Sequence, residues 1–219
     1  MSTDLWGRPL ALFDLDGVII DTRLAIQEAL RALSESAGIN VDQPSLTAGA
    51  ELPPVEALAL FGVSDPGYVY ESGFDAALKL ASGKVKVFDG TVRGMVAIAR
   101  EGAAVGIVTA QARRRLPLLI PPPVAEIVDV VVAYEDAAAK PSPDGILIAC
   151  ARCGVLPSRS LFVGDRPTDV RAGRAAGSLT VGAGWNAADI EALRAERPDV
   201  LLTSADQVGA HLLRLIGSQ

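Results

Sequence analysis

The sequence predicts an α/β protein built on a doubly wound parallel sheet, with a small all-helical segment inserted near its start. Short runs of apolar, often β-branched residues alternate with stretches of helical periodicity, and glycine, proline or aspartate bounds each run. Strand and helix in strict alternation give a parallel sheet that is covered by helices on both faces. The interval from Val18 to about Val87 breaks this alternation, because it shows only helical patterns.

The 219 residues are enough for one such sheet and one smaller domain. The predicted strands are, in order, residues 9–13, 104–108, 128–133, 160–163, 179–181 and 200–202. The helices predicted between and after them are residues 91–100, 143–153, 167–176, 187–196 and 205–215. We therefore assign residues 1–16 and 88–219 to the sheet domain and residues 17–87 to an inserted helical domain.

Within the insert, Asp21 is placed to cap a helix that runs through Leu33. Weaker helical patterns follow at residues 54–60 and 66–80. Residues 38–52 are rich in proline, glycine and small side chains, which predicts a surface loop.

Composition and charge narrow the range of partners. Half of the residues are hydrophobic, 21% are charged, and the formal net charge is -6. This balance argues against nucleic acid or an anionic membrane, because both bind clustered Lys and Arg. No stretch approaches the roughly 20 apolar residues of a membrane span, residues 1–9 lack the apolar run of a signal peptide, and two cysteines cannot build a disulfide framework. We expect a cytoplasmic monomer or homodimer that acts on a small molecule.

The first predicted strand ends in Phe13-Asp14-Leu15-Asp16-Gly17. Side chains two residues apart in a strand face the same side, so Asp14 and Asp16 can point together beyond its carboxyl end. Open α/β sheets bind ligands at that edge. Two carboxylates held this close repel each other, which predicts a cation between or beside them.

Polar side chains also follow three other predicted strands. Thr109 follows residues 104–108, Lys140 comes after the third strand and a loop of small residues, and Asp165 follows residues 160–163. Asp169 lies four residues further on, in the first turn of a helix. Acids, a hydroxyl and a lysine thus converge on one edge of the sheet, and oxygen ligands in this number suit a hard divalent cation.

These residues stand in four ordered motifs that resemble those of the haloacid dehalogenase (HAD) superfamily. The motifs are Asp14-Leu15-Asp16-Gly17-Val18-Ile19-Ile20-Asp21, Thr109, Lys140-Pro141-Ser142-Pro143 and Gly164-Asp165-Arg166-Pro167-Thr168-Asp169. The helical insert is similar to the C1 cap of the phosphoglycolate phosphatase and β-phosphoglucomutase branch. The resemblance covers nearly the whole chain and implies a HAD-like Rossmannoid core with an inserted cap.

The resemblance implies a phosphoric monoester hydrolase that uses Mg²⁺. Asp14 would attack phosphorus and form an aspartyl-phosphate. Asp16 would protonate the leaving oxygen and then help to activate the water that hydrolyses this intermediate. Thr109 and Lys140 would hold the phosphoryl oxygens.

The resemblance also implies a set of metal ligands. The carboxylates of Asp14 and Asp165 and the backbone carbonyl of Asp16 would bind Mg²⁺, and Asp169 would complete or orient that shell. Family members that cleave carbon–halogen bonds lack an acid at the position of Asp16. A phosphatase therefore fits better than a dehalogenase.

The sequence indicates less about the substrate than about the reaction. Residues 46–52 of the insert lack the arginine with which mutases and several sugar phosphatases of the branch hold a second anionic group, and Ala110-Gln111 replaces a more polar sequence after Thr109. Both departures favour a less anionic substrate than phosphoglycolate. The roles of Arg166 and Gln111 stay open, as do two alternatives: a phosphosugar mutase with the same nucleophile, and a non-catalytic protein that binds a phosphorylated ligand.

Overall fold

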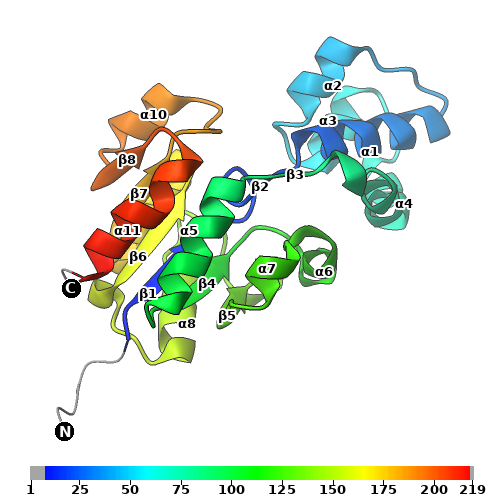
Figure 1. Cartoon of the computed structure of the whole chain (residues 1–219). Helices are drawn as coiled ribbons and strands as arrows, with labels where there is room; N and C mark the ends of the chain where they lie inside the picture. The colour runs from blue at the N-terminus through cyan, green and yellow to red at the C-terminus, as the bar shows by residue number, and fades with distance from the viewer. Residues whose placement is uncertain (1–7, 218–219) are drawn as a thin grey trace, which may run out of the picture. The chain divides into compact units, whose positions relative to one another are not determined.

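A computed structural model describes residues 8–217 of the chain (Figure 1). Its centre is a parallel six-stranded sheet with the strand order β5-β4-β1-β6-β7-β8. The strands are β1 (Leu10–Phe13), β4 (Ala104–Val108), β5 (Val130–Val132), β6 (Ser160–Gly164), β7 (Leu179–Ala183) and β8 (Val200–Leu202). The first strand pairs with β4 on one side and with β6 on the other. The predicted α/β class with a parallel sheet is confirmed.

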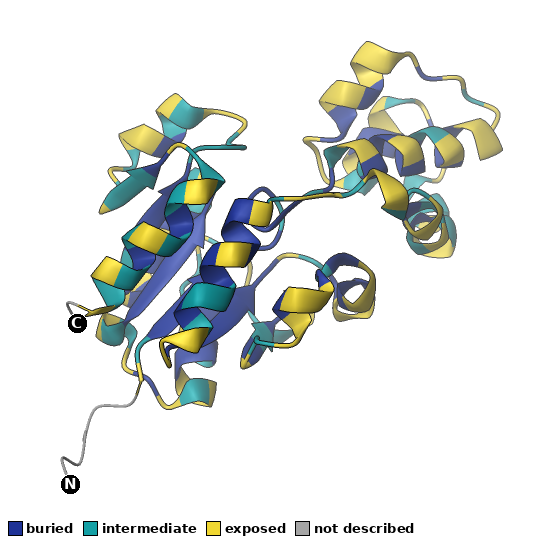
Figure 2. Cartoon of the chain, in the orientation of Figure 1, coloured by how far each residue is buried: buried dark blue, intermediate teal, exposed yellow. Residues whose placement is uncertain are grey.

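Helices cover both faces of this sheet. On one face, α8 (Asp144–Cys153) packs against β1, β4 and β5, and α9 (Pro167–Ala176) packs against β6 and β7. Along β1, Leu10 and Leu12 point to this face and join the core beneath the two helices. The strands in the middle of the sheet are buried along their whole length (Figure 2).

On the other face, α5 (Asp89–Arg100) packs against α11 (Val208–Gly217). The two helices approach closely at glycines. A Cβ atom added to Gly94 would lie 2.7 Å from a side-chain carbon of Val208 and 2.8 Å from the backbone nitrogen of Gly209. The remaining helices near the sheet are α6 (Leu116–Leu119), α7 (Pro122–Ala125) and α10 (Ile190–Ala195).

The chain divides into two compact units, Met1–Ile20 with Val87–Gln219, and Asp21–Lys86. The second unit is a helical bundle of α1 (Arg23–Ser36), α2 (Gln43–Gly49), α3 (Pro54–Leu60) and α4 (Pro66–Leu80). Its core is mainly apolar and includes Leu30, Leu46, Leu58 and Phe74, although Gln27 and Ser34 of α1 are also buried. The short strands β2 (Ile20–Asp21) and β3 (Lys86–Val87) pair with each other where the chain passes between the units.

The structure corrects three predictions of local structure. The predicted loop over residues 38–52 contains α2, which begins because Asp42 accepts a hydrogen bond from the backbone N–H of Ser45 and Leu46 is buried. The interval predicted to lack strands contains the two-residue β2 and β3. The N-cap of α1 is Thr22, although the Asp21 carboxylate does accept a hydrogen bond from the Arg23 N–H.

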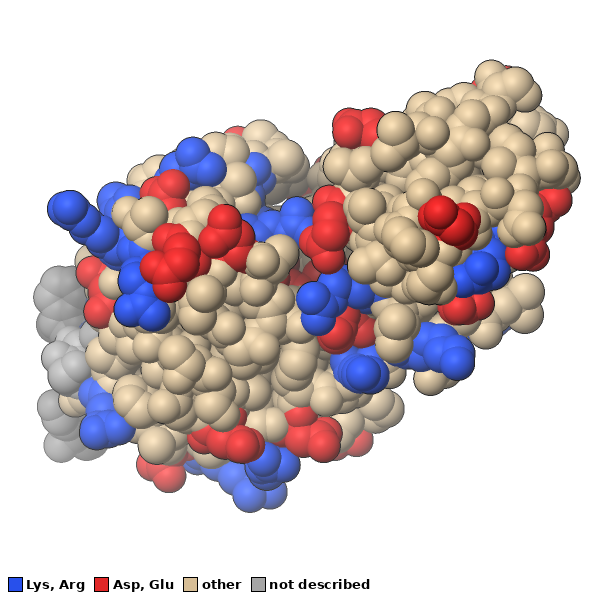
Figure 3. Space-filling view, turned by 90° about the horizontal axis from the view of Figure 1, so that it is seen from above, with Lys and Arg blue, Asp and Glu red and all other residues tan. Residues whose placement is uncertain are grey.

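Basic and acidic side chains are interspersed on the face of the molecule seen in Figure 3. Among residues 8–217, no helix is both long enough and apolar enough to cross a membrane. Residues 1–7, where most of the segment predicted to lack a signal peptide lies, fall outside the described part of the chain.

Candidate active site

Asp14 lies directly beyond the carboxyl end of β1, the strand with β4 and β6 on either side. Its backbone N–H donates a hydrogen bond to the carbonyl oxygen of Val163 at 2.9 Å, so the strand register extends to this residue. The residue is only 7% exposed. An aspartate at this place is held by the most buried part of the sheet, which fixes its position.

A tight turn follows Asp14 and places Asp16. The backbone N–H groups of Ile19 and Ile20 both donate to the carbonyl of Leu15, and the Gly17 N–H donates to the carbonyl of Ile20. Leu15 and the apolar residues Val18, Ile19 and Ile20 are fully buried. Buried side chains thus anchor the turn, while Asp16 itself is half-buried and faces partly toward solvent.

Lys140 contacts two of the predicted acids at once. Its Nζ lies 3.0 Å from Asp14 Oδ1 and 2.7 Å from Asp169 Oδ1. The ammonium group also lies 5.4 Å from the centroid of the Phe162 ring, within the range of a cation–π interaction. This lysine is therefore held in place from three sides at the carboxyl edge of the sheet.

Glycines make room for the two later acids. A Cβ atom on Gly17, which has a φ of +79°, would lie 2.0 Å from Asp165 Oδ2. A Cβ atom on Gly164 would lie 2.2 Å from the Cβ of Asp169. Any side chain at either glycine would displace an acid, so the glycines are part of the site's geometry.

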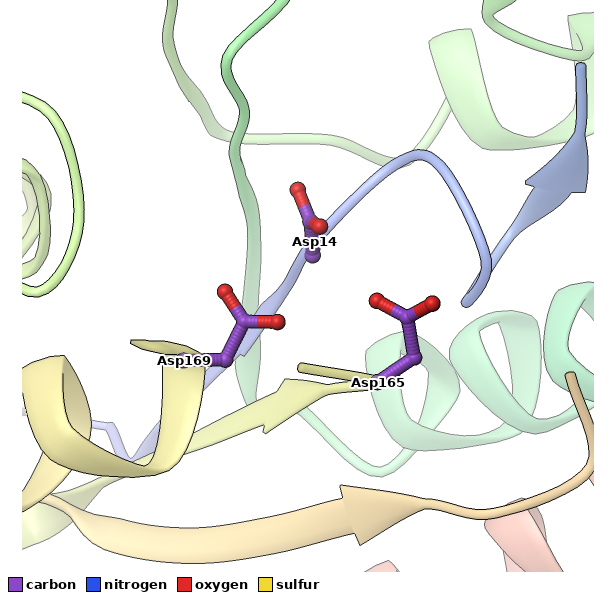
Figure 4. Close-up of side chains that lie close together, drawn as sticks. All are labelled: Asp14, Asp165 and Asp169. Carbon is purple, nitrogen blue, oxygen red and sulfur yellow. The ribbon is translucent and has the colours of Figure 1, made fainter. Parts of the chain in front are cut away.

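Three acids form a buried cluster (Figure 4). Asp14, Asp165 and Asp169 each offer a carboxylate oxygen, and these oxygens lie within 4.8 Å of one another. Asp165 Oδ1 is buried and has no hydrogen-bond partner among residues 8–217. An unpaired buried carboxylate oxygen beside two other carboxylates is the donor set that a hard cation such as Mg²⁺ requires. The side chain of Asp16 is not part of this cluster.

The cluster perturbs the acid–base properties of its members. Burial, together with the charges of Asp169 and Asp16, raises the pKa of Asp14 to about 7 against the opposing effect of Lys140. Burial and the charges of Asp14 and Asp169 raise the pKa of Asp165 to about 8. Burial alone would lower the pKa of Lys140, but the attraction of Asp14 and Asp169 outweighs it and raises that pKa.

Thr109 and Gln111 lie at the end of β4, next to β1. The buried Thr109 hydroxyl oxygen accepts a hydrogen bond from the Gln111 N–H at 3.1 Å, which leaves its own proton free to donate. Gln111 Nε2 donates to Asp16 Oδ2 at 2.9 Å. The sequence did not predict this contact, and its only signal was that Gln111 stands two residues after a candidate site residue.

The structure thus brings Asp14, Lys140, Asp165 and Asp169 into direct proximity, and it links Asp16 to Thr109 through Gln111. Arg166 is exposed, and its backbone N–H donates to Asp169 Oδ2 at 2.9 Å. Its positive charge also opposes the rise in the pKa of Asp165.

Comparisons with known proteins place the chain in context. A family model described as haloacid dehalogenase-like hydrolase matches residues 11–183. The N-acetylmuramic acid 6-phosphate phosphatase of Pseudomonas aeruginosa is 29% identical over 177 residues, which cover 77% of this chain and 78% of the relative. The phosphoglycolate phosphatase of Escherichia coli K12 is 33% identical over 114 residues, which cover 51% of this chain and 45% of that enzyme.

The fold is also similar to that of solved structures. A crystal structure of a Thermotoga maritima protein assigned as a β-phosphoglucomutase superposes with a TM-score of 0.81 and 22% identity. The superposition covers 94% of this chain and 99% of that one.

Proposed function

The chain belongs to the haloacid dehalogenase-like hydrolases, and we propose that it is a magnesium-dependent phosphatase acting on a small-molecule phosphate monoester. The observation that carries the proposal is the double contact of Lys140 with Asp14 and Asp169 beside Asp165. A nucleophilic carboxylate, a fixed cation and further carboxylates for a metal lie within one buried cluster. Both relatives compared above are named as phosphatases, which supports the same activity.

In the first step, a carboxylate oxygen of Asp14 attacks phosphorus, and the bond from phosphorus to the ester oxygen breaks. Asp16 donates a proton to the departing oxygen, so that an alcohol leaves rather than an alkoxide. The Asp14 side chain now carries the phosphoryl group. Lys140 Nζ and the free proton of the Thr109 hydroxyl stabilise the negative charge on the phosphoryl oxygens.

In the second step, a water molecule attacks the phosphorus of the aspartyl-phosphate. Asp16, now deprotonated, accepts a proton from this water, and the bond from phosphorus to the Asp14 oxygen breaks. Inorganic phosphate leaves, Asp14 is a carboxylate again, and Asp16 is protonated for the next cycle. The reaction therefore consumes one water and releases one alcohol and one phosphate.

Asp14, Asp165 and the backbone carbonyl of Asp16 are proposed to hold Mg²⁺, with Asp169 completing or orienting the shell. Bound Mg²⁺ would neutralise charge on the phosphoryl group and offset the repulsion between the nucleophile and an anionic substrate. The clustered carboxylate oxygens and the unpartnered Asp165 Oδ1 support this assignment. The cap role of residues 17–87, a cytoplasmic location and a monomeric or homodimeric state remain predictions.

The test is a phosphate-release screen with and without Mg²⁺, over sugar phosphates, phosphoglycolate, nucleotides, and aromatic and polyol phosphates. We expect Mg²⁺-dependent release of inorganic phosphate from at least one class. Transfer of the phosphoryl group within a sugar without its release would support the mutase instead. Binding of a phosphorylated compound with no turnover across the panel would support the non-catalytic alternative.

A further inference from the structure

Gln111 connects two distant parts of the chain at the carboxyl edge of the sheet. Its side-chain Nε2 donates a 2.9 Å hydrogen bond to Asp16 Oδ2, across a sequence separation of 95 residues. Asp16 lies in the turn after β1, and Gln111 follows β4, the neighbouring strand. The contact is therefore set by the sheet and by two short segments that leave it.

The backbone of Gln111 is held at both ends of the residue. Its N–H donates to Thr109 Oγ1 at 3.1 Å, and its carbonyl oxygen accepts a hydrogen bond from the N–H of Tyr134 at 3.0 Å. The next residue, Ala112, is buried. A side chain that starts from so constrained a backbone can orient its partner, because its own freedom is already restricted.

The amide is placed there in spite of an energetic penalty. Gln111 Oε1 is buried and has no hydrogen-bond partner in the described residues 8–217. An unpaired buried acceptor is unfavourable, because it has lost its hydrogen bonds to water without replacing them. A side chain kept at such a cost in contact with a reacting group suggests a role in function rather than in folding.

A glutamine also suits this place electrostatically. Three buried carboxylates already lie at this edge of the sheet, and a carboxamide donates a hydrogen bond without adding charge to them. A lysine would add a second cation to the edge that Lys140 already serves, and a glutamate would repel Asp16.

We infer that Gln111 is a positioning residue that orients the Asp16 carboxyl toward the ester oxygen of the substrate. The inference rests on the function proposed above, in which Asp16 transfers the proton. Without Gln111, the Asp16 carboxyl samples orientations in which it does not reach the leaving oxygen. The loss is then largest for substrates whose leaving group requires protonation.

The experiment compares two esters of similar size, 4-nitrophenyl phosphate and benzyl phosphate. Nitrophenolate leaves readily without a proton, whereas benzyl alkoxide needs one. Gln111→Met keeps the side-chain length but removes the hydrogen bond, and Gln111→Ala serves as a second variant. We expect kcat/KM to fall for both esters, and by at least about tenfold more for benzyl phosphate.

Gln207→Met is the matched control. Gln207 ends the 3₁₀ turn Ala205–Gln207, and its Oε1 accepts hydrogen bonds from the N–H groups of Thr203 and Ser204, a structural role. Its loss should lower the melting temperature without discriminating between the esters. Equal losses of kcat/KM for both esters in the Gln111 variants would overturn the inference while leaving the proposed function intact. If the wild-type protein released phosphate from neither ester and Asp14→Asn changed nothing, the proposed function would fail and the inference with it.

Discussion

The carboxyl edge of the six-stranded sheet and the helical unit Asp21–Lys86 bury opposite kinds of side chain. At the sheet edge, Asp14, Asp165 and Asp169 are all buried, and the side chain of Lys140 is only 14% exposed. Within residues 21–86, all of which the structure describes, no Asp, Glu, Lys or Arg is buried. The buried side chains of that unit are mostly aliphatic or aromatic, and its buried polar residues, Thr22, Gln27 and Ser34, are uncharged.

The sheet edge is therefore less favourable for stability than the core of the helical unit. Burying apolar side chains stabilises the helical unit by about 1.5–3 kcal/mol for each large one. Burying several carboxylates together is unfavourable, as the raised pKa values of Asp14 and Asp165 show. Perturbed and costly groups concentrate at functional sites. Substitutions of the acids at the sheet edge should therefore lower activity without lowering stability. Substitutions in the core of the helical unit should lower stability.

The largest effect is expected for Asp14→Asn. Without a nucleophilic carboxylate, kcat should fall by about 10⁴-fold or more. The same change removes one of the mutually repelling acids, while Lys140 keeps its 2.7 Å contact with Asp169. Differential scanning calorimetry in EDTA at pH 8 should thus show a melting temperature that is no lower than that of the wild type. Asp42→Asn is the control, because the exposed Asp42 only caps α2 and asparagine caps equally well.

A loss of stability is expected for Leu58→Ala in α3. Leu58 is fully buried, so its truncation should lower the free energy of unfolding by about 2–5 kcal/mol in urea titrations. Leu60, two residues further along the same helix, is 70% exposed, and Leu60→Ala should change that free energy by less than about 0.5 kcal/mol. Equal effects at the two leucines would contradict the burial pattern of the helical unit.

The sequence allowed more to be predicted about the sheet than about the insert. Strands such as 104–108 can be predicted because a short, continuous run of apolar residues is typical of a buried strand. Helix α2 was missed because Gln43-Pro44-Ser45 looks like a loop, and only the capping by Asp42 and the burial of Leu46 reveal it. Tertiary contacts decided this segment, and no local pattern carries that information.

The candidate site could be assembled in part from the sequence. Parallel strands end at one edge, so the proximity of Asp14, Lys140 and Asp165 follows from topology and was expected. The contact of Gln111 with Asp16 was not, since it depends on the path of two loops after they leave the sheet.

Asp165→Asn should separate metal binding from folding at the sheet edge. Asp165 contributes the unpartnered Oδ1 to the acid cluster, so its loss should weaken Mg²⁺ binding and lower kcat/KM by about 10²-fold, or ~2.7 kcal/mol. Thermal shift measurements with and without 10 mM Mg²⁺, an amount on the order of that used to saturate weak sites, should show the wild type stabilised and the variant much less so. A full Mg²⁺ response in the variant would exclude Asp165 as a ligand.

The last prediction concerns how the stability of the sheet edge depends on pH. The pKa values of Asp14 and Asp165 are raised to about 7 and about 8 in the folded protein, against 3.8 for an ordinary aspartate. The folded state therefore holds protons that the unfolded chain has released, and the stability of the metal-free protein must fall as the pH rises from 5.5 to 8.5. We expect a decrease in melting temperature of about 10 °C over this range in EDTA. Mg²⁺ competes with these protons and should reduce the decrease, and Asp165→Asn should reduce it without metal. A melting temperature in EDTA that rose steadily over this range would show that the buried acids do not destabilise the sheet edge.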